Sequence, residues 1–235
     1  MASDLLTAAE LAALRAWDTP SICNALELVA PQRRGLGYTT QPLVAAQPAL
    51  PPIVGYARTA TIRAMHPSTR SGAELREQRL AYYRSIAEGP QPNVVVIEDL
   101  DPEPGYGAFW GEVNSNIHRG LGCLGVVTNG SIRDLLQCAE GFQMLGGRVG
   151  PSHAFVHIEE FGGTVTVQGM TVRPGDLVHA DQHGAVVIPL EVARQVPAAA
   201  ALIAKREAMT IAASQRPDFT IEKLAAAMKD ADEIH

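Results

Sequence analysis

Two segments, Asn93-Val-Val-Val-Ile-Glu98 and Leu124-Gly-Val-Val-Thr128, decide the fold of this chain. Each is a short, continuous apolar run, which is the pattern of a β-strand covered on both faces. A helical pattern follows each run, over residues 112–119 and residues 132–144. The order strand, helix, strand, helix predicts a parallel βαβ unit with a right-handed crossover.

One more strand and one more helix are predicted immediately before this unit. Residues 53–65 are rich in β-branched side chains and predict a strand. Residues 71–87 have helical composition, and the helix is expected to stop at Gly89-Pro90.

Residues 1–30 predict two short helices, which a Pro- and Gly-rich connector separates from the first strand. Thr7 and Glu10 have the spacing of a capping box at the start of the first helix. Thr19 places a capping hydroxyl before Pro20, a residue that favours the first helical position of the second helix.

The pattern changes after Gly150, where short strands are separated by Gly-containing turns. Such punctuation is typical of β-hairpins, so the later sheet is expected to be largely antiparallel. The chain then closes with two helices. The predicted strands cover residues 154–161, 164–168, 170–172, 177–180 and 185–188, and the closing helices cover residues 190–213 and 220–229. Together these elements predict a single α/β domain over residues 1–235, with helical flaps at both ends.

Composition excludes several classes of protein. In a chain of 235 residues, 46% hydrophobic and 19% charged residues exclude a disordered or fibrous protein. A net charge of -6 without long basic runs argues against binding to nucleic acid. Three cysteines without a CxxC pair indicate a reducing compartment. The N-terminus lacks a basic signal-peptide region, and the longest apolar stretch, residues 196–204, is too short to cross a bilayer. We therefore expect a cytoplasmic protein with no membrane partner.

The candidate site lies where the two buried strands end. In open α/β sheets, ligands bind at the carboxyl ends of parallel strands. The first strand leads into Gly111-Glu-Val-Asn114, and the second leads into Arg133-Asp134 at the start of the predicted helix. If the strands are neighbours, these two segments face each other across one crevice.

The residues of the two segments suit a small 2-oxo acid. Gly111 permits close approach of a ligand, and the amides that follow it at a helix start bind anions. Arg133 offers a planar fork for a carboxylate or enolate oxygen. Asp134 is a hard oxygen ligand for Mg²⁺ or Mn²⁺, and Glu112 could hold a metal-bound water. The alternative is an ordinary Arg-Asp pair on the surface, where Asp134 only interacts with the helix dipole.

The segment Gly107-Ala-Phe-Trp-Gly-Glu112, followed by Leu124-Gly-Val-Val-Thr-Asn-Gly-Ser-Ile-Arg-Asp-Leu135, resembles the RraA-like family, which includes 4-hydroxy-4-methyl-2-oxoglutarate aldolases. The resemblance extends over residues 15–210, and residues 172–176 and 179–189 are similar to the later strands of the family. Its most specific part is an acidic residue, twenty intervening positions and then Arg-Asp, which Glu112 and Arg133-Asp134 match here.

The resemblance implies an α/β/β sandwich that assembles as trimers or dimers of trimers, with sites at subunit boundaries. It implies that the backbone around Gly111, Glu112, Val113 and Asn114 binds a pyruvate moiety, that Arg133 binds the substrate, and that Asp134 binds a divalent metal. The acidic position is aspartate in the aldolases and glycine in the ribonuclease regulators of the family. Glu112 keeps the carboxylate and extends it by one methylene.

From these residues and this resemblance we expect a metal-dependent lyase of the class II pyruvate aldolase type. It would cleave a 4-hydroxy-2-oxo acid to pyruvate and a carbonyl product, and decarboxylate oxaloacetate as a side activity. The crevice contains no lysine, which disfavours a Schiff-base route. Two alternatives remain open: a non-catalytic regulator that binds a ribonuclease or another protein, and a metal-dependent dehydratase or isomerase of a sugar acid.

The later strands carry several histidines that are weaker candidates for a metal site. Residues 179, 181 and 183 alternate as His, Asp and His, but Asp181-Gln-His-Gly184 has the pattern of a hairpin turn, which breaks the alternation. We expect structural or supporting roles for these histidines, which are His153, His157, His179 and His183.

Four further residues have ordinary explanations. Trp110 either forms a wall of the crevice or fills the core. Cys23 and Cys138 lie on predicted helices and are expected to be packing residues. Glu207 is expected on a solvated face of the long closing helix, although an acidic residue of the family reaches a neighbouring subunit's site from a similar place.

Overall fold

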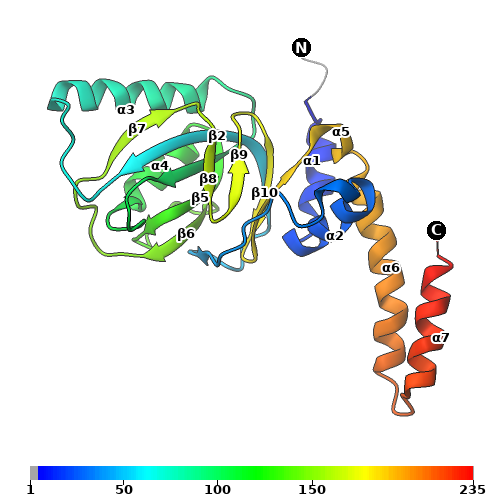
Figure 1. Cartoon of the computed structure of the whole chain (residues 1–235). Helices are drawn as coiled ribbons and strands as arrows, with labels where there is room; N and C mark the ends of the chain where they lie inside the picture. Colours follow the sequence, from blue (N-terminus) through cyan, green and yellow to red (C-terminus); the bar gives the residue numbers. More distant parts are fainter. Residues whose placement is uncertain (1–4, 235) are drawn as a thin grey trace.

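The computed structural model describes residues 5–234, which form a curled mixed sheet, a separate β-hairpin and helices at both ends of the chain (Figure 1). The order of strands in the large sheet is β1-β6-β5-β3-β2-β10-β11, with β4 beside β5 and β7 beside β2. β8 and β9 form the separate hairpin. The strands are β1 (Val44–Ala45), β2 (Ile53–Arg63), β3 (Asn93–Asp99), β4 (Ala108–Trp110), β5 (Cys123–Ile132), β6 (Gln143–Val149), β7 (His157–Phe161), β8 (Val165–Val167), β9 (Met170–Val172), β10 (Leu177–Asp181) and β11 (Gly184–Ile188).

The centre of the large sheet is parallel, and its later part is antiparallel. β3 lies between β2 and β5 and is parallel to both, and β5 is parallel to β6. The connection from β3 to β5 passes through the short strand β4 and then α4 (Glu112–Gly120). β10 is antiparallel to β2 and β11, and β7 is antiparallel to β2. The predicted βαβ unit and the predicted antiparallel later strands are both confirmed.

Alternation along β3 shows how the layers pack. Val95 and Ile97 belong to an apolar cluster with side chains of α3 (Gly72–Ala87), whereas Val94 and Val96 pack with residues of the β8–β9 hairpin. All four side chains are completely buried. Burial of each contributes about 1.5–3 kcal/mol to stability. Helices therefore cover one face of the sheet and a β-layer covers the other, which is the α/β/β arrangement that the resemblance implies.

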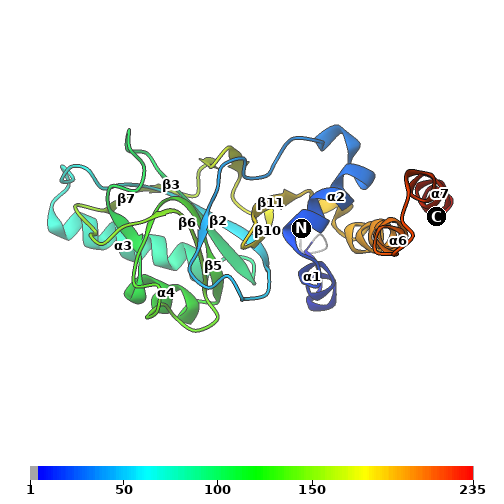
Figure 2. The ribbon, with the colours of Figure 1, turned by 90° about the horizontal axis from the view of Figure 1, so that it is seen from below.

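The terminal helices form a second packed unit at the end of the sheet away from α3 and α4 (Figures 1 and 2). The Tyr56 hydroxyl on β2 accepts a hydrogen bond of 2.7 Å from the Leu6 amide, which ties the N-terminus to the sheet. α6 and α7 run antiparallel and project from the body as an arm. The terminal elements are α1 (Ala8–Arg15), α2 (Thr19–Val29), the short 3-10 helix Pro31–Arg33, α5 (Leu190–Ala193), α6 (Val196–Ser214) and α7 (Ile221–Asp232).

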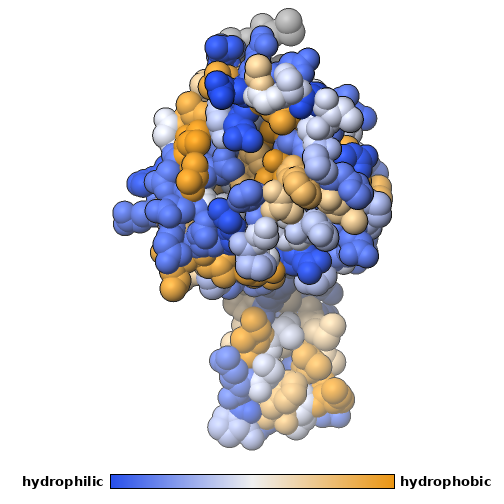
Figure 3. Space-filling model, turned by 90° about the vertical axis from the view of Figure 1, so that its left-hand side faces the viewer, coloured by the Kyte–Doolittle hydropathy of each residue, from blue (hydrophilic) through white to orange (hydrophobic). Residues whose placement is uncertain are grey.

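The surface of the body differs from that of the arm. Seen from the end that carries α3, the body is mainly hydrophilic with separate apolar patches, and the arm below it shows many apolar residues (Figure 3). Among residues 5–234, none of the helices combines the length and the apolar character that a membrane crossing requires.

The predicted helix over residues 132–144 is wrong. β5 continues to Ile132, β6 begins at Gln143, and the residues between them form a loop of turns. Asp134 and Gly141 have φ values of 52° and 74°, which an α-helix cannot contain. Arg133 and Asp134 therefore follow the end of a strand directly, and Cys138 lies in a loop and not on a helix.

Smaller corrections concern helix ends and strand bounds. The strand predicted over residues 154–161 begins only at His157, because residues 154–156 form a turn. Asp18, not Thr19, caps α2, because its carboxylate accepts a hydrogen bond of 2.9 Å from the Ser21 amide. The closing helix is divided into α5 and α6, and Pro197 lies in the first turn of α6, where a missing N–H is tolerated. β4 was not predicted, because three residues are too short to show a period.

Candidate functional site

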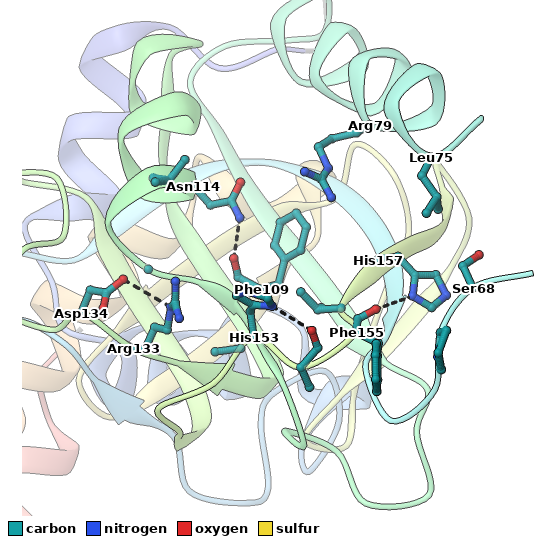
Figure 4. Close-up of a pocket in the computed structure, with 16 residues that line it drawn as sticks. Ser68, Leu75, Arg79, Phe109, Asn114, Arg133, Asp134, His153, Phe155 and His157 are labelled. Atoms are coloured by element: carbon teal, nitrogen blue, oxygen red, sulfur yellow. Dashed lines mark hydrogen bonds and ion pairs between the residues drawn. The ribbon is translucent and has the colours of Figure 1, made fainter. Parts of the chain in front are cut away.

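A cavity of about 470 Å³ opens beside the β4–α4 corner (Figure 4). Its walls come from four segments: the loop before α3 together with α3, the β4–α4 corner, the loop after β5, and the loop before β7. The lining residues are Pro67, Ser68, Leu75, Arg79, Ala108, Phe109, Gly111, Val113, Asn114, Arg133, Asp134, His153, Ala154, Phe155, Val156 and His157.

The parallel pairing of β4 with β5 brings the two predicted segments together. Trp110 is the partner of Ile132 in the strand register. The Arg133 amide continues the ladder by donating a hydrogen bond of 2.9 Å to the Trp110 carbonyl. Gly111 and Asp134, the next residues of the two segments, are consequently neighbours at the carboxyl edge of the sheet.

Gly111 is required by this close approach. A Cβ at this position would overlap the Asp134 carboxylate and lie 3.0 Å from the Cγ of Arg133. Its φ of -169° is ordinary extended backbone, so space and not conformation demands the glycine. The Glu112 amide donates to Oδ2 of Asp134 at 3.1 Å, so a side chain from another segment caps α4. The capping carboxylate also interacts favourably with the helix dipole.

The first turn of α4 retains free amides. The first backbone bond within the helix is donated by Ser115 to the Gly111 carbonyl at 3.0 Å. The amides of Val113 and Asn114 precede it and have no acceptor among residues 5–234. Both residues line the cavity, so it receives the anion-binding end of a helix.

Arg133 and Asp134 are half-exposed, and each retains unused binding capacity. Nε of Arg133 lies 3.4 Å from Oδ2 of Asp134, and its Nη1 donates a long bond to the Pro151 carbonyl. Oδ1 of Asp134 accepts no hydrogen bond from the described residues. Within the described part of the chain, three non-glycine residues have positive φ, and two of them, Asp134 and Ala154, line the cavity. Strained backbone of this kind costs about 1–3 kcal/mol per residue and is typical of functional sites.

A divalent cation fits this arrangement. Mg²⁺ is usually held by one or two carboxylates and keeps several water or substrate ligands. Asp134 supplies one such carboxylate, with Oδ1 available. Residues 5–234 contain no group of three or more His, Cys, Asp or Glu that could hold a metal by themselves. Water and substrate would therefore complete the coordination of a metal at Asp134.

Of the other predicted site residues, Val113 and Asn114 line the cavity and Glu112 does not. The Asn114 side chain accepts from the Tyr83 hydroxyl at 2.8 Å and donates to the Phe109 carbonyl, so it fixes α4 against α3. Val113 is exposed at the mouth of the cavity. The Glu112 side chain is exposed and does not line the cavity, so this residue contributes to the corner through its amide.

The sequence did not assign Arg79 or His153 to this site, although both line the cavity. Arg79 reaches the cavity from α3, and no ion pair or hydrogen bond occupies its guanidinium among the described residues. The sequence does contain a signal for this placement: Arg79 is four residues from both Leu75 and Tyr83, so the three side chains share one face of the helix. His153 was considered only with the other histidines. Its Nδ1 lies 2.8 Å from the Ala154 carbonyl, which can only accept, so in the neutral ring Nδ1 carries the hydrogen and Nε2 is the acceptor.

The other three histidines that the sequence singled out have structural roles. Both ring nitrogens of His157 are occupied at 2.8 Å, by the Phe155 carbonyl and by Glu159. His179 is buried between the Thr19 hydroxyl and the Trp17 carbonyl, and burial lowers its pKa to about 4. His183 contacts Asp181 in a two-residue hairpin, as the turn pattern predicts.

Four other residues lie away from the cavity. Trp110 is completely buried and packs on His118 at a centroid distance of 4.5 Å, so it belongs to the core. Cys23 is half-buried on α2, and burial raises the pKa of its thiol to about 11. Cys138 is buried in the loop after β5. Glu207 is exposed on the α6–α7 arm.

Solved structures with the same fold have low sequence identity to this chain. No curated protein is significantly similar to it. A structure described as novel cellulases from gut-associated microbes has a TM-score of 0.70 at 16% identity, with 87% of each chain covered. An uncharacterized protein from Pseudomonas syringae pv. tomato has a TM-score of 0.70 at 21% identity, with 94% of each chain covered.

A third structure is Streptomyces coelicolor RraAS2, an unusual member of the RNase ES inhibitor RraA protein family. It has a TM-score of 0.68 at 20% identity, and the match covers 90% of this chain and 98% of that one. At these identities the three structures show a common fold. The family model of the RraA-like proteins, described as Aldolase/RraA, matches residues 19–187 and includes the whole β4–α4 corner and Arg133-Asp134. The chain therefore belongs to the RraA-like family.

Proposed function

We propose that the protein is a divalent-metal-dependent lyase that cleaves a 4-hydroxy-2-oxo acid to pyruvate and a carbonyl compound. The observation that carries this proposal is the convergence of free helix-start amides, Arg133 and Asp134 in one cavity. Membership of a family that includes aldolases supports it. A metal bound at Asp134 would polarise the 2-oxo group and favour the enolate.

The chain's own groups account for binding of the pyruvate half. The amides of Val113 and Asn114 bind the C1 carboxylate at the start of α4. The open part of the Arg133 guanidinium donates to the 2-oxo oxygen, where negative charge develops as the C3–C4 bond breaks. Both groups hold their positions before substrate binds, because the β4–β5 ladder fixes the two segments.

His153 supplies the proton acceptor that cleavage requires. Its Nε2 takes the proton of the 4-hydroxyl, the C3–C4 bond breaks, and the bonding electrons form the enolate of pyruvate. The carbonyl product leaves, and return of the proton from Nε2 of His153 to C3 completes pyruvate and restores the neutral histidine. Loss of CO₂ from oxaloacetate yields the same enolate, so we expect this side activity. The chain's lysines, Lys205, Lys223 and Lys229, all lie on α6 and α7, so no lysine lines the cavity to form a Schiff base.

The direct test is a panel of 2-oxo acids with identification of products. The protein is incubated with oxaloacetate and with 4-hydroxy-2-oxo acids in the presence of Mg²⁺, Mn²⁺ or Co²⁺, and pyruvate is followed by a coupled assay. We expect metal-dependent pyruvate release that a chelator abolishes. No turnover of any substrate with any of these metals would contradict the proposal.

The position of Glu112 favours a second candidate, a regulator that binds a ribonuclease. Its carboxylate lies outside the cavity, and RraAS2, which has the same fold, belongs to a family of ribonuclease inhibitors. Such a protein would bind a ribonuclease with defined stoichiometry and release no pyruvate. A pull-down with purified ribonuclease, run beside the substrate panel, distinguishes the two functions.

A further inference from the structure

Arg79 is a second arginine in the cavity, and it has no role in the proposed lyase reaction. It reaches the cavity from α3, whereas Arg133 reaches it from the loop after β5. Figure 4 shows Arg79 directed toward Phe109, with Arg133 and Asp134 on the other side of that ring. The cavity therefore has a guanidinium at each of two separate places.

The orientation of α3 holds Arg79 over the cavity. Leu75, Arg79 and Tyr83 are spaced by four residues and share one face of the helix. Leu75 and Arg79 line the cavity, and the Tyr83 hydroxyl donates to Asn114 at 2.8 Å. Tyr82 on the adjoining face is completely buried. Rotation of α3 would break these contacts, so packing fixes the backbone position from which the exposed Arg79 side chain reaches the cavity.

Arg79 differs from the other arginines nearby, because each of those is paired with a carboxylate. An adjoining hollow of about 370 Å³ contains Arg63 and Arg70, which pair with Asp101 at 3.6 Å and Glu159 at 3.5 Å. Arg133 faces Asp134. Arg79 has no such carboxylate among residues 5–234, so its positive charge is available to an anion.

We propose that Arg79 is a specificity-determining residue that binds a second carboxylate, carried on C4 of the substrate. The inference rests on the proposed function. The helix-start amides and Arg133 receive the C1 carboxylate and the charge of the enolate, so the negative charge that fits Arg79 lies at the opposite end of the molecule. A cavity of about 470 Å³ has room for both ends. A guanidinium binds a carboxylate through two parallel hydrogen bonds. Arg79 therefore favours dicarboxylic over monocarboxylic 4-hydroxy-2-oxo acids.

Binding of two inert ligands tests this without any reaction. 2-Oxoglutarate and 2-oxobutyrate differ by one terminal carboxylate, and neither has a 4-hydroxyl or a carboxylate that the enolate chemistry can remove. Dissociation constants are measured by calorimetry with Mg²⁺ present. We expect the wild type to bind 2-oxoglutarate about 10- to 100-fold more tightly than 2-oxobutyrate, which is the range of a charge-assisted hydrogen bond.

Three variants test whether the preference for 2-oxoglutarate depends on Arg79. Arg79→Met should remove the preference by weakening 2-oxoglutarate alone, and Arg79→Lys should keep part of it. Arg76→Met is the matched control, because Arg76 is an exposed arginine of α3 that does not line the cavity, and it should leave both affinities unchanged. Circular dichroism confirms folding.

Two results would overturn the role of Arg79: equal affinity of the wild type for both ligands, or an equal loss of both in Arg79→Met. These results are separable from failure of the proposed reaction. If no substrate yields pyruvate while the preference for 2-oxoglutarate depends on Arg79, the binding inference holds and the lyase reaction is wrong. If pyruvate is released equally fast from mono- and dicarboxylic substrates by wild type and Arg79→Met, the lyase stands and the role of Arg79 is wrong.

Discussion

At the scale of single residues, the geometry of the β4–α4 corner depends on Gly111, the residue without a Cβ atom. Gly111 and Asp134 lie so close that a Cβ on Gly111 would enter the space of the carboxylate. The same carboxylate accepts from the Glu112 amide and faces Arg133. Gly111 thus leaves room for the Asp134 side chain both to cap α4 and to pair with Arg133, while Asp134 itself has a positive φ.

Replacement of Gly111 by alanine should damage both stability and activity. The added methyl group forces Asp134 or Arg133 to move, and overpacking of this kind costs about 1–3 kcal/mol. The free energy of unfolding in urea and the rate of pyruvate release measure the two effects. Gly120→Ala, at the end of α4, is the control, because no atom lies within 4 Å of its added Cβ. Equal stability of the two variants would show that the corner is not tightly packed.

Arg133→Lys should separate binding of the substrate from binding of the metal. Lysine keeps the charge and loses the planar fork, so kcat/KM for oxaloacetate should fall about 10- to 100-fold. The Mg²⁺ concentration that gives half-maximal activity should remain nearly unchanged, because Asp134 carries the metal in this proposal. Steady-state kinetics over a range of Mg²⁺ tests both statements. An unchanged kcat/KM would remove Arg133 from the reaction.

At the scale of elements, local patterns predicted strands and helices better than they predicted the loops between them. The runs that became β3 and β5 are apolar because helices and a hairpin cover them, and that signal is visible in the sequence. The loop after β5 was mistaken for a helix, because its φ of 52° at Asp134 is imposed by contacts with a distant segment. Arg79 was missed for a related reason: composition predicts α3, and only packing decides which face of it meets the cavity.

Acid should weaken the contacts that two buried histidines make between elements. His118 on α4 contacts the Tyr82 hydroxyl on α3 through Nε2, and its Nδ1 contacts the Asn114 carbonyl within α4. His179 joins the start of α2 to β10. Burial lowers the pKa of each imidazole from 6.5 to about 4. The unfolded chain therefore binds protons first as the pH falls. Their contribution to stability is complete above about pH 6.5 and is lost as the pH falls from there toward 4.

This loss amounts to roughly 2 kcal/mol for each histidine at pH 5. Urea unfolding at pH 7.5 and pH 5.0 measures it. His179→Gln should be less stable than the wild type at pH 7.5 and should show a smaller difference between the two pH values. A pH difference identical to that of the wild type would mean that His179 does not contribute to it.

At the scale of the whole molecule, the arm is the feature that a single chain leaves unexplained. α6 and α7 project from the body, and Ile211 and Met228 are about half exposed, at 52% and 54%, beside a shallow apolar hollow between the two helices. Apolar residues gathered on a projecting arm are typical of contacts between subunits. We propose that the arm packs against another copy of the chain in a trimer or a dimer of trimers.

Light scattering tests this assembly. The mass of the protein in solution should be three or six times 25.0 kDa. The double variant Ile211→Ser and Met228→Ser should lower the mass at the same concentration while the helical signal remains. A monomer for the wild type, or an unchanged mass for the variant, would contradict the role of the arm.

The central claim, that Asp134 holds a metal beside a pyruvate enolate, is tested most directly by the kinetics of Asp134→Asn. Asparagine preserves the volume and an oxygen that accepts from the Glu112 amide, so the fold should persist, and circular dichroism checks that it does. The measurement is pyruvate release from oxaloacetate and a 4-hydroxy-2-oxo acid over a range of Mg²⁺, for the wild type and this variant. We predict that metal-dependent turnover falls by several orders of magnitude in the variant. Turnover equal to that of the wild type, with the same dependence on Mg²⁺, would contradict the claim and leave Arg133-Asp134 as an ordinary ion pair at a strand end.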